Sequence, residues 1–269
     1  MTKKKLIGFL ITLFLITSVI ILFSFVFCVR EQEVSVVNSN PITVGKSEIL
    51  TAANIKDGSP IFMINKEKAT ENIENKFPYV KVVQIQTTGL RKINIIVRAR
   101  VKMYYTEYEN DYYIFDEDLK LLEISHDRPI NLIQIEEGVL EITDKTTVCD
   151  FVGTVKQKNI MLNLYKAMTT TVLKNDGENE VYLNREDICN VLKSVSFEEY
   201  ETFDKLIITT SYGVKLDIET PQKDLDYKIN ICFSTIKNFI ENANDYEKSG
   251  VIRLFYNLNG DLECKYFEI

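Results

Sequence analysis

The sequence is poor in histidine, glycine and proline. Of its 269 residues, 1 is histidine, 10 are glycine and 5 are proline. With His126 alone, a metal site built from several histidines is excluded, and a Ser-His-Asp triad would depend on this one residue. No glycine-rich phosphate-binding loop, P-loop or nucleophile elbow is present. The scarcity of glycine and proline also leaves no flexible linker after the N-terminal segment.

The cysteines form no C-x-x-C pair. Cys28 lies in an apolar N-terminal run, and the other four are widely spaced, at Cys149, Cys189, Cys232 and Cys264. Outside the cytoplasm such cysteines can form disulfides, in more than one connectivity. Each also lies among apolar residues, where a free thiol behaves as a small hydrophobe. We therefore favour unpaired core cysteines over a disulfide framework.

The charge balance argues against a nucleic-acid partner. The formal net charge is −7, and all the acidic residues lie beyond residue 29. A phosphate backbone would be repelled by such a surface, so we expect no nucleic-acid binding.

The first residues predict a membrane anchor. Lys3, Lys4 and Lys5 precede an uncharged run from Leu6 to Val29, which is long enough to cross a hydrocarbon core of about 30 Å. The lysines place a cytoplasmic tail at 1–5 and residues 31–269 outside the cytoplasm. A cleaved signal peptide is the competing interpretation. Its apolar region is usually about 7–15 residues long and ends in small residues, whereas this run ends in Phe-Val-Phe-Cys. We therefore predict a transmembrane helix over 6–29, in contact with the lipid bilayer of the plasma membrane.

The segment 31–100 predicts a small α+β domain in the order strand, helix, helix, strand, strand. A short strand at 33–37 precedes a helix that Ser47 can cap, a turn at Asp57-Gly58-Ser59-Pro60, and a helix that Asn65 can cap. Pro78 ends the second helix. A strand over 79–87 follows, with a bend between Val82 and Val83, and then a strand with Ile93, Ile95 and Val97 on one face. This order is the POTRA topology.

Residues 101–269 predict a mixed, β-rich domain with flanking helices. The run begins with three strand patterns separated by short polar turns and ends with two more, joined at Asn259-Gly260. Helices are expected at 158–172, at 185–193 with Asn184 as cap, and from Leu225, with Leu225, Ile229, Phe233, Ile236 and Ile240 facing inward. A hairpin is expected through Ser211-Tyr212-Gly213. The fold class is thus α+β throughout, behind an N-terminal transmembrane helix.

This layout resembles the FtsQ/DivIB family of bacterial cell-division proteins. The resemblance rests on "ILTAANIKDGSPIFMIN", "IENKFPYVKVVQIQ", "INIIVRARV", "YYIFDEDLKLL" and "VIRLFYNLNG", with Arg100 and Tyr256 at the family's arginine and tyrosine positions. Ala99, Lys102 and Leu119 depart from the family's glutamate, proline and glycine. The resemblance implies a single-pass, non-enzymatic scaffold of the division septum, whose C-terminal strands bind FtsB/DivIC-like and FtsL-like membrane proteins.

The last two strands are the candidate partner-binding site. A strand at the chain terminus is a natural sheet edge, and an edge can accept a strand from another chain. Large aromatic and arginine side chains are frequent interface anchors. The candidates are Arg253, Phe255, Tyr256, Tyr266 and Phe267. Because side chains alternate along a strand, half of these residues could instead face the core, and both readings stay open.

Other chemistry is weakly indicated. His126 adjoins Asp127 in a polar stretch that predicts an exposed loop, and the acidic run Asp116-Glu117-Asp118 lacks the EF-hand pattern and predicts a solvated turn. We expect no catalytic residue, no metal and no cofactor. A POTRA-type adaptor in secretion or sporulation, or an extracytoplasmic hydrolase that uses Asp116 or His126, are the alternative functions, because a fold alone does not fix function.

Overall fold

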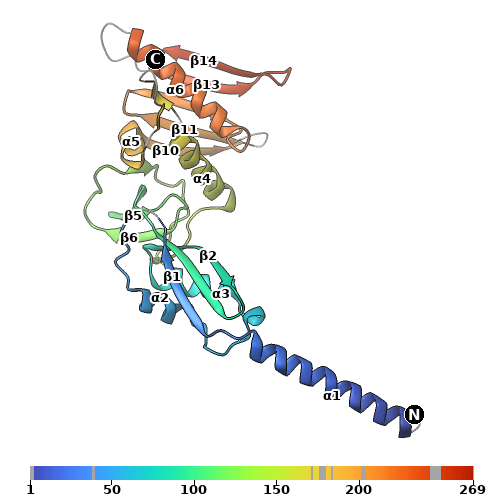
Figure 1. Cartoon of the computed structure of the whole chain (residues 1–269). Helices are drawn as coiled ribbons and strands as arrows, with labels where there is room; N and C mark the ends of the chain where they lie inside the picture. Colours follow the sequence, from blue (N-terminus) through green and yellow to red (C-terminus); the bar gives the residue numbers. More distant parts are fainter. Residues whose placement is uncertain are drawn as a thin grey trace. The chain divides into compact units, whose positions relative to one another are not determined.

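The computed structural model divides the chain into two compact units, Met1–Arg100 and Val101–Ile269. It describes residues 3–37, 40–170, 172–175, 180–182, 184–200, 204–242 and 250–268. Figure 1 shows a long N-terminal helix and a small sheet with two helices in the first unit, and a larger sheet with helices in the second. Each unit has its own apolar core.

The first unit begins with helix α1, Lys3–Val26. Its described side chains begin at Leu10, and the large apolar ones among them are exposed as far as Phe25. The side chains of Lys3, Lys4 and Lys5 lie outside the described ones. Across the described residues, no helix is long and apolar enough to cross a membrane. The helix ends before the predicted limit at residue 29, because Cys28 and Val29 are buried in the folded unit.

The rest of the first unit has the order predicted from the sequence. Strand β1 (Glu31–Val36) lies parallel to β3 (Lys92–Ala99), and β2 (Val80–Thr88) lies antiparallel to β3 on its other side. Helices α2 (Lys46–Ala53) and α3 (Lys66–Lys76) and the short 3-10 helix η1 (Ile61–Met63) connect β1 to β2 (Figure 1). Ile93, Ile95 and Val97 face the core, as the alternation predicts.

Most of the predicted helix and strand ends of this unit are confirmed. Asn65 caps α3, since its Oδ1 accepts from the backbone N–H of Lys68 at 2.9 Å. The register of β2 shifts between Val82 and Gln84, as predicted. The predicted cap at Ser47 is wrong: Gly45 is the cap of α2, and its backbone N–H donates to Glu48 Oε2 at 2.9 Å. The glutamate side chain thus satisfies the N–H group at the helix start.

A buried ion pair joins α3 to the sheet. Glu74 Oε2 lies 2.7 Å from a terminal guanidinium nitrogen of Arg100, and Glu74 Oε1 accepts from the backbone N–H of Val82 at 2.8 Å. Both residues are buried. The carboxylate of Glu74 therefore bonds to β2 at its register shift and to Arg100, the residue that follows β3. Arg100, at the family's arginine position, thus has a structural partner.

The second unit is built on a nine-stranded sheet with the order β14-β13-β12-β11-β10-β7-β4-β5-β6. The strands are β4 (Tyr104–Tyr108), β5 (Asp111–Phe115), β6 (Leu121–Ser125), β7 (Ile133–Ile135), β10 (Leu192–Glu199), β11 (Asp204–Thr210), β12 (Val214–Glu219), β13 (Gly250–Tyr256) and β14 (Leu262–Glu268). β8 (Val172–Asn175) and β9 (Glu180–Tyr182) form a separate pair.

Three helices share one core with this sheet: α4 (Val155–Thr170), α5 (Arg185–Val191) and α6 (Leu225–Asn242). Leu164 of α4 and Ile229 of α6 lie in one cluster with Leu206, Leu216 and Leu254 of the strands. Alternate residues of β11, β12 and β13 are buried toward these helices. The helices therefore cover one face of this part of the sheet (Figure 1).

Sequence periodicity misplaced several boundaries in this unit. The helix predicted at 185–193 ends at Val191 and passes directly into β10, because Leu192 and Val195 are needed in the core of the sheet. Asn184 caps α5 as predicted, with Oδ1 accepting from the N–H of Asp187 at 3.1 Å. The helix predicted at 158–172 spans Val155–Thr170. The side chain of Ile240 lies outside the described ones.

Candidate functional site

The candidate site is the hairpin of β13 and β14. The two strands pair antiparallel from Gly250↔Glu268 to Tyr256↔Leu262, as predicted. Asn257 Oδ1 accepts from the N–H groups of Asn259 and Asp261, each at 2.9 Å, and Gly260 takes φ +83°. In the described sheet, β14 is the end strand (Figure 1). The backbone groups on its outer side therefore face no strand of the described sheet.

The five predicted residues divide between the two faces of this hairpin. Arg253, Phe255 and Phe267 point away from the helices, as their register pairs require, whereas Tyr256 and Tyr266 point toward them. Phe267 is exposed, and Tyr266 packs against the core cluster. The structure thus brings three of the five together on the open face.

The open face is a network of charged and aromatic side chains. The guanidinium of Arg253 lies 5.4 Å from the ring centroid of Phe267, and its Nε donates to Asp217 Oδ2 at 2.9 Å. Lys205 Nζ donates to the same oxygen at 3.1 Å. Lys265, which is opposite Arg253 on β14, places its Nζ 5.0 Å from the ring centroid of Phe255, diagonally across the two strands. These contacts hold Arg253 and the aromatic rings in place.

Asp217 is the member of this network that sequence reasoning missed. It is buried although it lies on the open face of the sheet, and its Oδ1 has no hydrogen-bond partner among the described residues. A buried carboxylate oxygen without a partner is costly, and the bonds that Oδ2 accepts from Lys205 and Arg253 offset part of that cost. The signal that could have found it is an acidic residue at an alternating position of a strand that reads LDI.

Tyr256 joins the hairpin to the start of α6. Its hydroxyl donates to Asp224 Oδ2 at 3.1 Å, and Lys228 Nζ lies 4.7 Å from its ring centroid. Burial and the Asp224 carboxylate raise the pKa of Tyr256. Lys228 Nζ donates to the carbonyls of Glu219 and Thr220 at 2.7 and 2.9 Å, and burial lowers the pKa of Lys228 to about 8. Tyr256 therefore links β13 to the start of α6, and it also stays a candidate partner-binding residue.

Tyr266 covers Gly250 at the start of β13. A Cβ atom on Gly250 would lie 2.3 Å from Cε2 of the tyrosine ring, far inside van der Waals contact. Any larger residue at this position would therefore displace the ring of Tyr266. This contact fixes the terminal strand against the sheet.

The residues considered for catalysis do not form a site. The side chain of His126 is 93% exposed, which confirms the exposed loop, and its Nδ1 contacts Asp111 rather than Asp127. Ser125, the adjacent hydroxyl, donates to the backbone carbonyl of Asp127. Burial raises the pKa of Cys189 and Cys232, which keeps these thiols protonated.

The acidic run is a buried turn, so the prediction of a solvated turn is wrong. Asp116 and Glu117 are buried, and Asp116 Oδ1 accepts from the backbone N–H groups of Asp118 and Lys120, each at 2.9 Å. The carboxylates of Asp116, Glu117 and Asp118 come within 4.8 Å of one another, which is close enough to hold a cation. The backbone bonds of Asp116 give this cluster a structural role without one.

The cysteines are unpaired, as favoured from the sequence. Cys28, Cys189 and Cys232 are buried, but Cys149 is half-buried and Cys264 is exposed on β14. The expectation of a core position is therefore wrong for Cys264, which lies on an edge strand.

Comparison with known proteins agrees with the fold of the first unit. Residues 32–100 match the POTRA domain, FtsQ-type. The chain is 33% identical over 82 residues to a protein named cell division protein DivIB of Clostridium botulinum, a segment covering 30% of this chain and 32% of that protein. DivIB of Clostridium acetobutylicum is 31% identical over 99 residues, covering 36% and 39%. DivIB of Clostridium tetani is 26% identical over 151 residues, covering 55% of each chain. The matched segments thus span from about a third to about half of these relatives.

Proposed function

Because this chain belongs to the FtsQ/DivIB family, we propose that it acts in bacterial cell division as a non-enzymatic scaffold. It binds partner membrane proteins outside the cytoplasm and couples assembly of the septum to cell-wall synthesis. The free edge of β14, next to an ordered cluster of charged and aromatic side chains, is the observation that carries this proposal. The buried thiols, the exposed histidine and the backbone-bonded acidic turn support the absence of catalysis.

The edge of β14 offers both affinity and selectivity to an added strand. Main-chain hydrogen bonds supply the affinity, and alternate side chains supply the selectivity. A partner strand beside β14 would meet Lys265 and Phe267 on the open face, with Phe255 and Arg253 one strand further in. Arg253 is paired with Asp217, and Lys265 Nζ lies 2.6 Å from Glu263 Oε2, so an added strand would meet paired charges on this face. The proposed partners are FtsB/DivIC-like and FtsL-like single-pass proteins.

The N-terminal segment is proposed to hold the scaffold at the membrane. The uncharged run 6–29 and the exposed apolar side chains of α1 support a transmembrane helix, and Lys3 to Lys5 support a cytoplasmic N-terminus. Anchoring of both partners in one membrane raises their effective concentration, so modest contacts suffice. The proposed location is the plasma membrane at the division septum. Resistance of the membrane-bound chain to alkaline carbonate extraction tests the anchor.

The direct test removes one outward-facing N–H from β14. The backbone N–H of Asn257 donates to the carbonyl of Asp261 at 2.9 Å. Asn257 and Asp261 are thus a hydrogen-bonded pair, and such pairs alternate with non-hydrogen-bonded pairs along an antiparallel ladder. Counting from there, Leu254 and Cys264 form a non-hydrogen-bonded pair. The backbone N–H of Cys264 therefore points away from β13. Cys264→Pro removes this donor and leaves the bonds to β13 intact. Cys264→Ala removes the same thiol and keeps the donor, so it is the matched control.

Membrane proteins captured by the tagged full chain are identified and quantified by mass spectrometry. We expect the alanine variant to retain single-pass division proteins and the proline variant to lose about tenfold or more. Equal capture by both variants, with amide exchange showing an intact β13, would sink strand addition at this edge. Unseptated cells on depletion of the chain separate a division role from secretion or sporulation.

A further inference from the structure

The foot of α1 is tied directly to the first folded unit. The backbone N–H of Val29 donates to the carbonyl of Ser59 at 2.9 Å, and the N–H of Ile61 donates to the carbonyl of Phe27 at 2.8 Å. The N–H of Arg30 donates to the carbonyl of Arg91 at 2.9 Å. The η1 turn and the β2–β3 turn are therefore hydrogen-bonded to the residues that directly follow α1, and they lie beside the end of the helix (Figure 1).

These two turns present large apolar side chains to the outside. Phe62 and Met63 of η1 are 61% and 72% exposed, and Leu90 between β2 and β3 is 56% exposed. Phe25, on the last turn of α1, is 73% exposed. Single exposed apolar residues are ordinary, but these stand on adjoining segments at one end of the unit, which marks an interaction surface. We call Phe62, Met63 and Leu90 the apolar rim.

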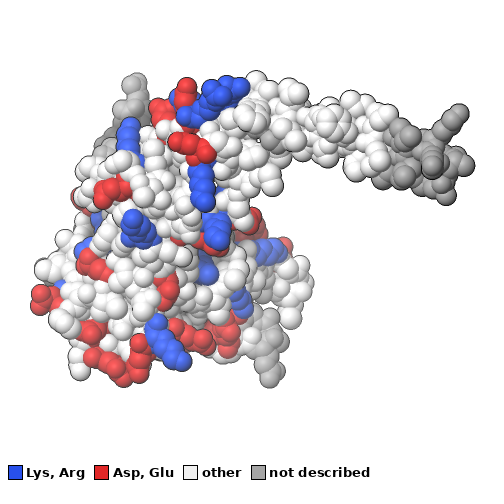
Figure 2. Space-filling view, turned by 90° about the horizontal axis from the view of Figure 1, so that it is seen from below, with Lys and Arg blue, Asp and Glu red and all other residues white. Residues whose placement is uncertain are grey.

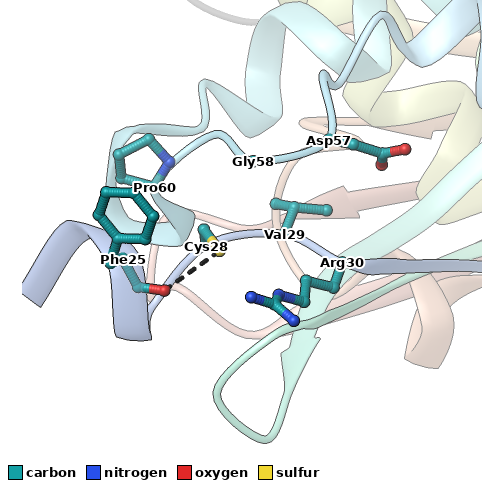
Figure 3. A pocket seen from close by; sticks show the side chains of 7 residues that line it. All are labelled: Phe25, Cys28, Val29, Arg30, Asp57, Gly58 and Pro60. Carbon is teal, nitrogen blue, oxygen red and sulfur yellow. Dashed lines mark hydrogen bonds between the residues drawn. The ribbon is translucent and has the colours of Figure 1, made fainter.

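Basic side chains lie beside the apolar rim. Arg91 Nε donates to the carbonyl of Val26 at 3.1 Å, so it caps the end of α1. Arg30 is exposed next to it and lines an open pocket of about 630 Å³ with Phe25, Val29 and Pro60 (Figure 3). In Figure 3 Phe25 and Pro60 lie at one end of this pocket, and Arg30 and Asp57 lie at the other. Figure 2 shows no charged side chain along the described part of the helix, and both basic and acidic side chains where it joins the folded part.

We propose that the apolar rim and Arg30 form a second membrane contact, which seats the first unit in the interfacial layer of the bilayer. This inference rests on the proposed anchoring of α1. From Leu6 to Val26 a helix is about 31 Å long, which matches the hydrocarbon core. The turns bonded to Phe27, Val29 and Arg30 must then lie at headgroup level. Apolar side chains there enter the acyl boundary, and arginine binds lipid phosphate.

The absence of tryptophan in this chain makes the test direct, since one introduced tryptophan is the only one. Leu90→Trp and Phe62→Trp place it at two separate points of the apolar rim. Val83→Trp is the matched control, because Val83 is 51% exposed on β2 of the same unit. It lies on the order of 20 Å from Leu90 along the strand. Each full-length variant is reconstituted in vesicles of phosphatidylcholine and phosphatidylglycerol, with bromine on the acyl carbons near the glycerol.

Both rim variants are expected to show blue-shifted emission and at least about twofold stronger bromine quenching than Val83→Trp. Quenching at the rim no greater than at Val83 would overturn the proposal and leave the rim for a protein partner. Carbonate extraction of the same vesicles tests the anchor by itself: a chain that is extracted refutes the anchoring, whereas an anchored chain with an unquenched rim refutes only this inference. Arg30→Gln is expected to reduce quenching at Leu90 in vesicles that contain phosphatidylglycerol, and no change would refute the phosphate contact.

Discussion

Leu119 occupies a backbone conformation that glycine adopts more easily, so its substitution gives a sharp prediction. It has φ +60° in the turn between β5 and β6, at the position of the family's glycine, and its side chain is fully buried. Its N–H donates to the carbonyl of Asp116 at 3.2 Å, and its carbonyl accepts from Val152 at 3.0 Å. The side chain therefore stabilises the core while the backbone around it is strained.

The two effects have magnitudes that can be separated. Truncation of a buried leucine to alanine costs about 2–5 kcal/mol. A left-handed conformation costs an L-residue about 1–2 kcal/mol that glycine does not bear. At an ordinary position glycine is about 0.5–1 kcal/mol less stable than alanine. We therefore expect Leu119→Ala to lower the free energy of unfolding by about 3 kcal/mol. The Leu119→Gly variant is expected to be more stable than the Leu119→Ala variant by roughly 0.5 kcal/mol or more.

Amide hydrogen exchange of β5 and β6 measures these free energies in the second unit. Leu121 is the matched control, because it is equally buried but lies in strand β6. There we expect glycine to be less stable than alanine by about 1 kcal/mol. If glycine is the less stable substitution at both positions, backbone strain at Leu119 does not contribute and the reasoning is refuted.

Two further predictions concern buried charges. In the folded chain the pKa of Lys228 is about 8, below its usual 10.5, so the unfolded state binds more protons between these values and stability rises with pH across that window. We expect Lys228→Met to remove about 2–3 kcal/mol of this rise, as measured by urea unfolding at pH 8 and pH 10, and an unchanged rise would contradict the assigned pKa. Glu74→Gln leaves Arg100 buried without its counter-charge and is expected to destabilise the first unit by about 3 kcal/mol. The exposed Glu71→Gln on the same helix should change it by less than about 0.5 kcal/mol, and equal effects in the two variants would argue against the ion pair.

Local patterns predicted the first unit well because its elements are short and adjacent in sequence. The cap at Asn65, the irregularity after Val82 and the inward face of β3 each follow from residues within one turn or one strand. Glu74 could not be found this way. Its partners, Val82 and Arg100, lie on two strands beyond the helix, and only the folded sheet brings them together.

The second unit depends more on contacts between distant residues. β7 is short and pairs in parallel with both β4 and β10, and no nearby turn signals either pairing. At the candidate site, alternation predicted that Phe255 and Tyr256 point to opposite faces, but not which face the helices cover. Asp217 was missed because its partners, Lys205 and Arg253, come from the two neighbouring strands. The terminal position of β14 was predictable, and the charge network beside it was not.

The central claim is that β14 receives a partner strand, and photo-crosslinking in dividing cells tests it most directly. A benzophenone amino acid replaces Phe267 on the open face of β14, and in a second strain it replaces Tyr212, an equally exposed aromatic residue in the β11–β12 turn. We expect a crosslink from position 267 to a single-pass division protein and none from position 212. Crosslinking to that protein from position 212 alone, or from neither position, would contradict the claim.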